Sequence, residues 1–252
     1  MDITNNLRKL TASLGDVKYR RRSGCFKAEG TKCVLDTIKH FELEYLFATP
    51  EWLEVHSGLS VNEKAVAVTK ADLIKMSSLS TAPGVIAVYR MPVYGLEPES
   101  LRGSLTVALD GVQDPGNLGT VIRTADWFGV RNILCSRDTV DVYSPKVIQA
   151  TMGAISRVRV HYCDLSETLI KLKGMPVYGT FLDGGNIYDE PLSDTGIIVM
   201  GNEGKGISGS VARIITDRLY IPPYPADAET SESLNVGVAT AITLAEFRRR
   251  CI

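Results

Sequence analysis

The sequence predicts an α/β fold with a mainly parallel sheet and flanking helices, preceded by a smaller α/β domain. From residue 105 onward, short apolar segments with strand character alternate with segments of helical periodicity, which is typical of βαβ units. Residues 92–103 are rich in Pro, Gly and charge and show no periodicity, which indicates a connection between domains. We therefore expect an N-terminal domain over 1–92, a linker over 93–104 and a C-terminal domain over 105–252.

Composition restricts the class of protein. The chain has 252 residues, of which 44% are hydrophobic, and no segment approaches the length of a membrane span, so we expect a cytoplasmic protein without membrane contact. The five cysteines share no C-x-x-C spacing, and the three histidines fall outside every motif. Neither a disulfide framework nor a metal site is therefore expected.

The first 40 residues are basic and form the start of the N-terminal domain. They hold nine Lys or Arg against four Asp or Glu, although the whole chain has a net charge of -1. The densest patch contains Lys18, Arg20, Arg21 and Arg22 together with Tyr19, a combination suited to phosphates and a stacked base. We predict RNA binding by these four basic residues. A solvated basic tail explains the same pattern equally well.

The remaining segments of the N-terminal domain follow in order as short elements. Apolar spacing predicts a helix over 29–41, and residues 71–76 predict one or two helical turns. Strands are expected over 43–48, 65–68 and 84–91. These elements are enough for one compact α/β domain that ends near Pro92.

The segment 105–130 organises the C-terminal domain because it predicts one strand, one tight turn and one helix. Leu105, Val107 and Leu109 alternate with other residues, and a turn rich in Gly, Asp and Pro follows. Asn117 lies where an N-cap is expected, and the helix also holds Arg123. Both polar residues are thus predicted near the carboxyl end of the strand, where open α/β sheets bind their ligands.

Further strands are expected over 132–136, 158–162, 177–182, 197–201 and 219–224, with helices over 146–154, from 165, and over 233–247. The last helix is apolar on nearly all sides before three arginines, which predicts burial on more than one side, by the core or by a second subunit. Three of the strands end in polar or glycine-rich turns that expose backbone N–H groups, as anion and nucleotide sites require. None of these turns has Walker A spacing.

A dinucleotide-binding turn is one alternative for the second of these. Gly204, Gly206 and Gly209 match G-x-G-x-x-G after a predicted strand, and acidic residues follow about 20 positions later. This pattern would predict a nucleotide-cofactor oxidoreductase. However, the fingerprint usually opens its domain, whereas here only a short segment follows it.

Taken together, the three turns resemble the SpoU, or TrmH-like, family of RNA ribose 2'-O-methyltransferases of the SPOUT superfamily. The three motifs occur in order as DPGNLGTVIRTADWFGV, IIVMGNEGKGIS and IPPYPADAETSESLNVGVATAI. In the N-terminal part, YRRRSGCFKAEG and STAPGVIAVYRMP resemble the substrate-binding domain of this family, which is similar to small ribosomal proteins. The resemblance implies a C-terminal trefoil knot, a homodimer and S-adenosyl-L-methionine as cofactor.

The resemblance also implies site residues. The cofactor is expected to be held largely by backbone groups of Thr180, Gly201, Ile221 and Leu234. The loop 222–232 is longer and richer in proline than the Ile-Pro-Met-Gly turn of relatives, which is expected to alter cofactor affinity or loop closure.

The catalytic residues implied are Asn117, Arg123, Glu203, Ser233 and Asn235, acting without a metal. Arg123 is expected beside the RNA phosphate. A guanidinium stays protonated at physiological pH, so a phosphate clamp is the simpler role. The family proposal that this arginine takes the ribose proton remains an alternative. Taken singly, Asn117 and Ser233 are explained equally well as helix caps, and Glu203 as a turn carboxylate.

By analogy with this family, the additional N-terminal domain implies ribosomal RNA as the substrate, with transfer RNA as the alternative. A catalytically silent RNA-binding or ribosome-assembly protein with the same fold is the alternative function. The intact polar residues of the three motifs argue against it.

Overall fold

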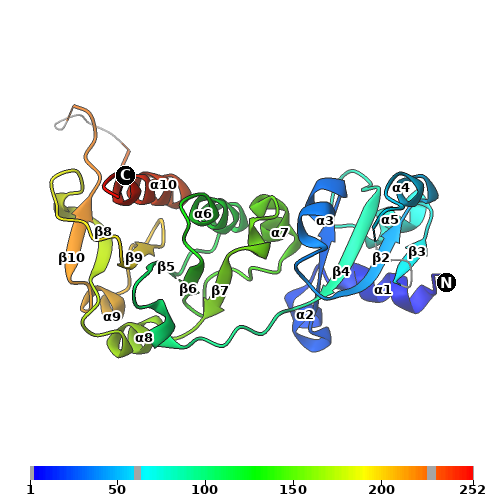
Figure 1. Cartoon of the computed structure of the whole chain (residues 1–252), viewed down its shortest axis with the longest axis horizontal. Helices are drawn as coiled ribbons and strands as arrows, with labels where there is room; N and C mark the ends of the chain where they lie inside the picture. Colours follow the sequence, from blue (N-terminus) through cyan, green and yellow to red (C-terminus); the bar gives the residue numbers. More distant parts are fainter. Residues whose placement is uncertain (1–2, 60–63, 226–230, 252) are drawn as a thin grey trace. The chain divides into compact units, whose positions relative to one another are not determined.

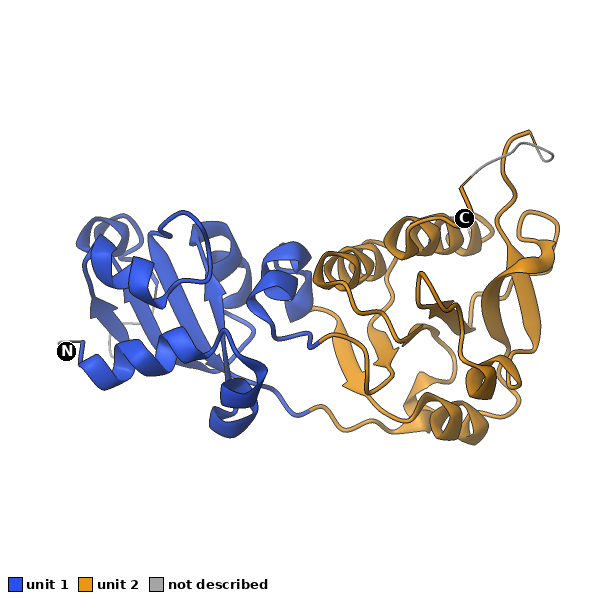
Figure 2. Ribbon diagram, turned by 180° about the vertical axis from the view of Figure 1, so that it is seen from behind, with its two compact units in different colours: residues 1–93, 141–156 blue, residues 94–140, 157–252 orange. Residues whose placement is uncertain are grey.

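A computed structural model describes residues 3–59, 64–225 and 231–251 and divides into two compact units. Unit 1 contains Met1–Val93 and Asp141–Ser156, and unit 2 contains Tyr94–Val140 and Arg157–Ile252, as Figure 2 shows. The segment Asp141–Ser156, which lies inside the domain expected over 105–252, thus belongs to the same compact unit as the N-terminal part of the chain. The proposed domain boundaries at 92 and 105 remain a prediction.

Unit 1 is built on a four-stranded sheet of order β1 (Cys25–Glu29), β4 (Val85–Arg90), β2 (Leu43–Ala48) and β3 (Ala65–Ala67). β4 runs antiparallel to β1 and β2, whereas β2 and β3 are parallel. Its helices are α1 (Asn5–Ser13), α2 (Val17–Ser23), α3 (Thr31–Thr37), α4 (Pro50–Val55), α5 (Lys70–Met76), α7 (Pro145–Thr151) and the 3-10 turn η2 (Ala154–Ser156).

Most predicted elements of unit 1 are present, but the helix predicted over 29–41 is shorter, since α3 begins at Thr31 and ends at Thr37. Glu29 belongs to β1, and Gly30 has a φ of 89°, a left-handed conformation that separates the strand from α3. The short elements α1, α2, α4 and β1 were not predicted. Polar and basic side chains dominate α1 and α2, so apolar periodicity does not reveal them.

A buried ion pair lies inside unit 1. Lys27 and Glu29 are 1% and 3% exposed, and their Nζ and Oε1 atoms are 3.0 Å apart. Lys27 Nζ also donates to the carbonyl of Met76 at 2.5 Å, and the Glu29 carboxylate accepts from Ser77 Oγ and from Ser78 N–H at 3.0 Å. Burial lowers the pKa of Lys27, and the adjacent Glu29 carboxylate opposes this effect. The pair joins β1 to the segment that follows α5.

The segment Asp141–Ser156 is held to unit 1 by Arg20. This side chain is only 2% exposed, its Nη2 lies 2.6 Å from Asp141 Oδ2, and its Nη1 donates to the carbonyls of Leu14 at 2.8 Å and Gly15 at 2.9 Å. The rings of Phe26 and Tyr143 pack at 4.8 Å between centroids. Arg20 therefore joins two distant parts of the sequence within one unit.

Unit 2 is built on a six-stranded sheet in which every neighbouring pair is parallel, with helices on both faces. The strand order is β10 (Asp217–Tyr220), β8 (Val177–Asn186), β9 (Gly196–Gly201), β5 (Leu105–Asp110), β6 (Asn132–Cys135) and β7 (Arg159–Tyr162). In Figure 1, α6 (Pro115–Trp127) and α10 (Val236–Arg249) cover one face, and α8 (Leu165–Lys171) and α9 (Gly209–Ala212) cover the other. The predicted α/β fold with a mainly parallel sheet and flanking helices is confirmed.

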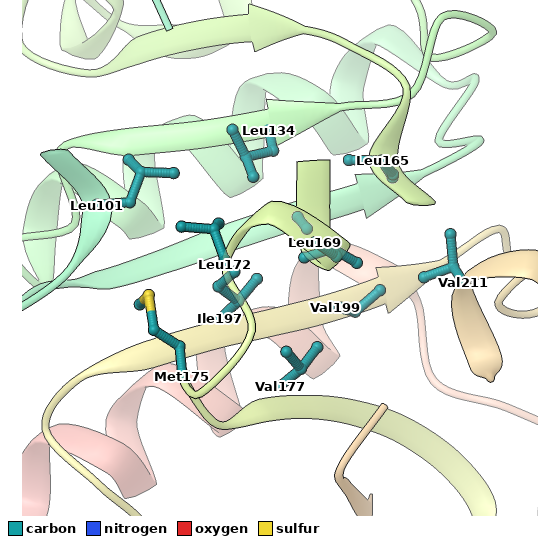
Figure 3. Close-up of a cluster of buried hydrophobic side chains, with 11 residues drawn as sticks. Leu101, Leu134, Leu165, Leu169, Leu172, Met175, Val177, Ile197, Val199 and Val211 are labelled. Carbon is teal, nitrogen blue, oxygen red and sulfur yellow. The ribbon is translucent and has the colours of Figure 1, made fainter. Parts of the chain in front are cut away.

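The core beneath α8 shows how the strand alternation positions the sheet. Ala108 of β5 and Ile197 and Val199 of β9 pack against leucines of α8, as Figure 3 shows for the labelled side chains of this cluster. Nearly all residues of β5 and β9 are buried. Because successive side chains of a strand point to opposite faces, this burial means that both faces of these strands are covered.

No helix within the described residues has the length and apolarity needed to cross a membrane.

The C-terminal helix α10 is buried over much of its surface, as its apolar pattern predicts, and its arginines bind defined partners. Arg248 Nε donates to the carbonyl of Phe128 at the end of α6, at 2.8 Å. Arg250 donates to the carbonyls of Ile187 at 3.1 Å and Tyr188 at 2.8 Å, and also binds Glu246. The arginines thus tie α10 to α6 and to the segment that follows β8.

Acid titration is expected to weaken this arrangement through Glu246. Its carboxylate, 5% exposed, accepts two hydrogen bonds from Arg249 and one from Arg250, which lower its pKa from 4.5 to about 2. Because the folded-state pKa is the lower one, the stabilisation is present above about pH 4.5 and is lost as the pH falls toward 2. Glu246→Gln should therefore lower the melting temperature near neutral pH, and the difference from wild type should shrink as the pH falls. A difference that stays constant across this range would contradict the assignment.

Candidate functional site

A cleft in unit 2 lies at the carboxyl ends of β9 and β10, beside β8 and the start of α10. Its volume is about 480 Å³, within the range typical of small-molecule sites. Met200, Leu219 and Val236 give it an apolar wall, and Glu203, Lys205 and Glu232 lie among its polar lining. All four residues predicted to hold a cofactor line it: Thr180, Gly201, Ile221 and Leu234. Residues 226–230 of the long proline-rich loop lie outside the described residues.

The turn after β9 forms one side of this cleft and is closed on itself. Asn202 N–H donates to the Gly206 carbonyl at 3.1 Å, and Gly206 N–H donates back at 2.8 Å. A Cβ placed on Gly201 would lie 2.4 Å from the carbonyl carbon of Gly206 and 2.5 Å from Ile207 N. Any side chain at position 201 would push the turn away, so the backbone can approach this closely only through glycine.

Two polar residues that the sequence analysis did not select hold this turn against the turn after β5. Asn202 Nδ2 donates to the Gly111 carbonyl at 2.7 Å, and its Oδ1 accepts from the N–H groups of Gly204 at 2.9 Å and Lys205 at 3.0 Å. Asp110 at the end of β5 accepts from Ser208 N–H at 2.7 Å. A polar side chain directly at the end of a buried strand is the signal that would have identified both.

Side chains from all three predicted motifs meet beside the cleft. Asn117 Nδ2 donates to Glu203 Oε1, and Asn235 Nδ2 donates to Asn117 Oδ1 at 2.9 Å. The other amide atom of Asn235, Oδ1, accepts from the N–H groups of Gly237 and Val238 at the start of α10. The two amides and the carboxylate form one chain of hydrogen bonds across three segments that are distant in the sequence.

The helix caps differ from those considered in the sequence analysis. The N-cap of α6 is Asp114, whose carboxylate accepts from Asn117 N–H at 2.8 Å, so Asn117 lies within the first turn. The N-cap of α10 is Asn235 and not Ser233. Capping therefore does not account for Asn117 or Ser233, whereas Asn235 both caps α10 and binds Asn117.

Arg123 and Ser233 lie outside this chain of hydrogen bonds. Arg123 is exposed on α6, and it forms no hydrogen bond or ion pair with any residue that the structure describes. Ser233 lines the cleft and is also exposed. Both are free in the described part of the chain to contact a ligand.

The basic residues of the patch on α2 differ in their exposure. Lys18, Arg21 and Arg22 are exposed, and Tyr19 between them is 46% exposed. Arg20 points into unit 1, where it binds Asp141, so its guanidinium has a structural partner and not a free surface. Helical geometry explains the difference, because Arg20 lies on the inner face of α2.

The glycine pattern of the second turn does not form a dinucleotide site. Gly204 and Gly206 belong to the closed turn, and Gly209 begins α9, which contains only four residues. The fingerprint requires a helix N-terminus directed at a pyrophosphate directly after the strand. All five cysteines are unpaired, and the described residues contain no group of three His, Cys, Asp or Glu placed to bind a metal ion.

Two family models and a relative of similar length match this chain. The model of the SpoU rRNA Methylase family matches residues 104–245, and that of the MRM3-like substrate binding domain matches residues 5–87. The chain is 30% identical over 234 residues to the 23S rRNA (guanosine(2553)-2'-O)-methyltransferase RlmP of Bacillus subtilis, covering 92% of this chain and 91% of the relative.

Solved structures show the same similarity. A protein from Porphyromonas gingivalis, assigned to the TrmH family of RNA methyltransferases, superposes with a TM-score of 0.89 at 40% identity, covering 99% of this chain and 100% of the other. An AdoMet-bound rRNA methyltransferase from Sinorhizobium meliloti superposes with a TM-score of 0.85 at 28% identity, covering 100% and 97%.

Proposed function

The chain belongs to the SpoU rRNA methylase family, and we propose that it transfers a methyl group from S-adenosyl-L-methionine to a ribose 2'-hydroxyl of ribosomal RNA. The observation that best supports this proposal is the hydrogen-bonded chain of Glu203, Asn117 and Asn235 beside a cleft of cofactor size. Asn235 caps α10, but capping explains neither Asn117 nor the meeting of side chains from three separate motifs at one point.

The cleft fits the cofactor in size and in the character of its lining. Its apolar wall suits an adenosine group, and Gly201 lets the backbone approach without a side chain. We propose that backbone groups at Thr180, Gly201, Ile221 and Leu234 hold the cofactor, which supplies a methyl group on a positively charged sulfur. Because these contacts come from main-chain atoms, the side chains of this family can vary around the site.

The polar residues have separate proposed roles. The chain of Glu203, Asn117 and Asn235 orients the ribose, since each member is fixed by a neighbour and reorganises little during the reaction. Ser233 contributes a hydroxyl at the cleft. Arg123, which is exposed, clamps the RNA phosphate next to the reacting ribose and stabilises the charge that develops there.

We propose that residues 1–92 bind the RNA, as a domain similar to small ribosomal proteins, with Lys18, Arg21 and Arg22 among the contacts. The match to a substrate-binding domain over residues 5–87 supports this role. Ribosomal RNA is the preferred substrate because the related enzyme from B. subtilis is named for it. We also propose that the protein works in the cytoplasm, together with its ribosomal RNA substrate.

Reversal of two charges in the basic patch is expected to weaken RNA binding. The variant Arg21→Glu/Arg22→Glu should lower RNA affinity about tenfold or more. It should also reduce the slope of log affinity against log salt by about one to two, because fewer counterions are released when fewer phosphates are neutralised. Binding is measured by fluorescence anisotropy over a series of salt concentrations. Lys39→Glu/Lys75→Glu, at exposed positions in the same unit, gives the same change in net charge. Equal salt slopes in both double variants would remove the patch from the RNA interface.

We also propose the homodimer and the trefoil knot of this family. α6 and α10 pack against each other and expose large apolar side chains, with Trp127 85% and Val238 48% exposed, which favours a covering second subunit.

Transfer of labelled methyl from S-adenosylmethionine to RNA from a strain lacking this protein tests the function. Ribose methylation protects the adjacent phosphodiester from alkali, so a new alkali-resistant position establishes the activity and identifies the nucleotide. No incorporation into ribosomal or transfer RNA, together with no cofactor binding, would favour a silent RNA-binding protein.

A further inference from the structure

Lys205 is the one basic residue among the described residues that line the cleft. Its side chain is exposed and forms no hydrogen bond or ion pair within the described parts of the chain. Its backbone is nevertheless fixed, because Lys205 N–H donates to Asn202 Oδ1 at 3.0 Å inside the closed turn. Lys205 thus lines the cleft from a fixed backbone position, and its side chain has no partner among the described residues.

The other ionisable groups of the cleft explain why a cation is needed there. Glu203 and Glu232 both line it, and Glu203 is already engaged by Asn117. A ligand carboxylate that entered a cleft with these two acids would be repelled unless a cation compensated it. Lys205 lies two residues from Glu203 on the same turn, so it is the group placed to do so.

We propose that Lys205 recognises the α-carboxylate of the cofactor and so selects a ligand with an intact amino-acid group. This inference rests on the proposed function, because it assigns a residue to one end of S-adenosylmethionine. Glu232, the other acid that lines the cleft, would favour the α-ammonium of the same ligand. Lys205 and Glu232 would then recognise the amino-acid end of the cofactor by its two charges. Main-chain contacts would hold the remainder of the cofactor.

Two ligands that differ only in the carboxylate test the assignment. Calorimetry measures the affinity of wild type and Lys205→Met for S-adenosylmethionine and for its decarboxylated form, which keeps the sulfonium and the ammonium. Wild type should bind the decarboxylated form about tenfold more weakly, as loss of a charge-assisted contact at an exposed site predicts. Lys205→Met should lose about tenfold toward S-adenosylmethionine and little toward the decarboxylated form, so that the two ligands bind alike.

A matched control is Lys171→Met, which removes an exposed lysine of α8 away from the cleft lining and should change neither affinity. The inference is overturned if Lys205→Met binds S-adenosylmethionine as tightly as wild type, or if both ligands weaken equally. If wild type binds neither ligand, the proposed function itself fails, which separates that result from a failure of Lys205 alone.

Discussion

Arg123→Ala is expected to reduce methyl transfer about a thousandfold while cofactor affinity stays unchanged. Removal of a group that stabilises developing charge costs about 10² to 10³ in turnover, and loss of a phosphate contact adds to this. Arg123 does not line the cleft and has no partner in the described residues, so its removal leaves the cofactor site intact. Single-turnover methylation and cofactor calorimetry on the same preparation measure the two effects.

A matched control and a conservative variant sharpen this test. Arg213→Ala removes an exposed arginine elsewhere in unit 2 and should turn over normally. Arg123→Lys keeps a positive charge but loses the planar fork, so a phosphate clamp predicts partial activity with an unchanged pH profile. A shifted pH profile in Arg123→Lys would favour the alternative in which this residue takes the proton. Normal turnover in Arg123→Ala would exclude it from the mechanism.

Lys27→Met is expected to destabilise unit 1 by about 3–5 kcal/mol, the usual cost of breaking a buried ion pair from one side. The change leaves the Glu29 carboxylate at 3% exposure with its bonds to Ser77 and Ser78 but without its cation. Trp52, which is buried in unit 1, reports unfolding by fluorescence in urea, and a Trp127→Phe background removes the only other tryptophan.

Two further variants test the cause. Lys27→Met/Glu29→Leu removes both charges and should recover much of the lost stability, because no unpaired ion remains in the interior. Lys9→Met, at an exposed position of α1, should change stability by less than about 0.5 kcal/mol. If Lys27→Met were as stable as wild type, this result would contradict the burial of the Lys27–Glu29 ion pair away from water.

The central strands of the unit 2 sheet could be predicted from the sequence because most of their residues are apolar. β5 and β9 are buried along nearly their whole length, and the alternation within 105–109 and the apolar run 197–200 reflect this burial. The helices α1 and α2 could not be found in this way, because capping by Thr4 and Asp16 and packing of a few residues define them. Local pattern does not report such tertiary contacts.

The sequence predicted which residues belong to the candidate site but not the hydrogen bonds between their side chains. Three motifs selected Asn117, Glu203 and Asn235, yet only the fold shows that their side chains bond in series. Asn202 and Asp110 were not selected, although each stands at the end of a buried strand, because only the fold shows that they bind the backbone of another turn. Arg20 shows the opposite error, since a basic run does not indicate which of its members faces inward.

The place of Asp141–Ser156 in unit 1 has a practical meaning for dissecting this protein. A fragment that ends at the predicted boundary would retain Arg20 but lack Asp141, and it would retain Phe26 but lack Tyr143. An RNA-binding assay on that fragment would then measure a unit in which Arg20 has lost its carboxylate partner and Phe26 has lost an aromatic neighbour. Unit 1 is thus completed by a segment that lies far beyond the predicted linker, so a fragment of residues 1–92 lacks part of its own packing.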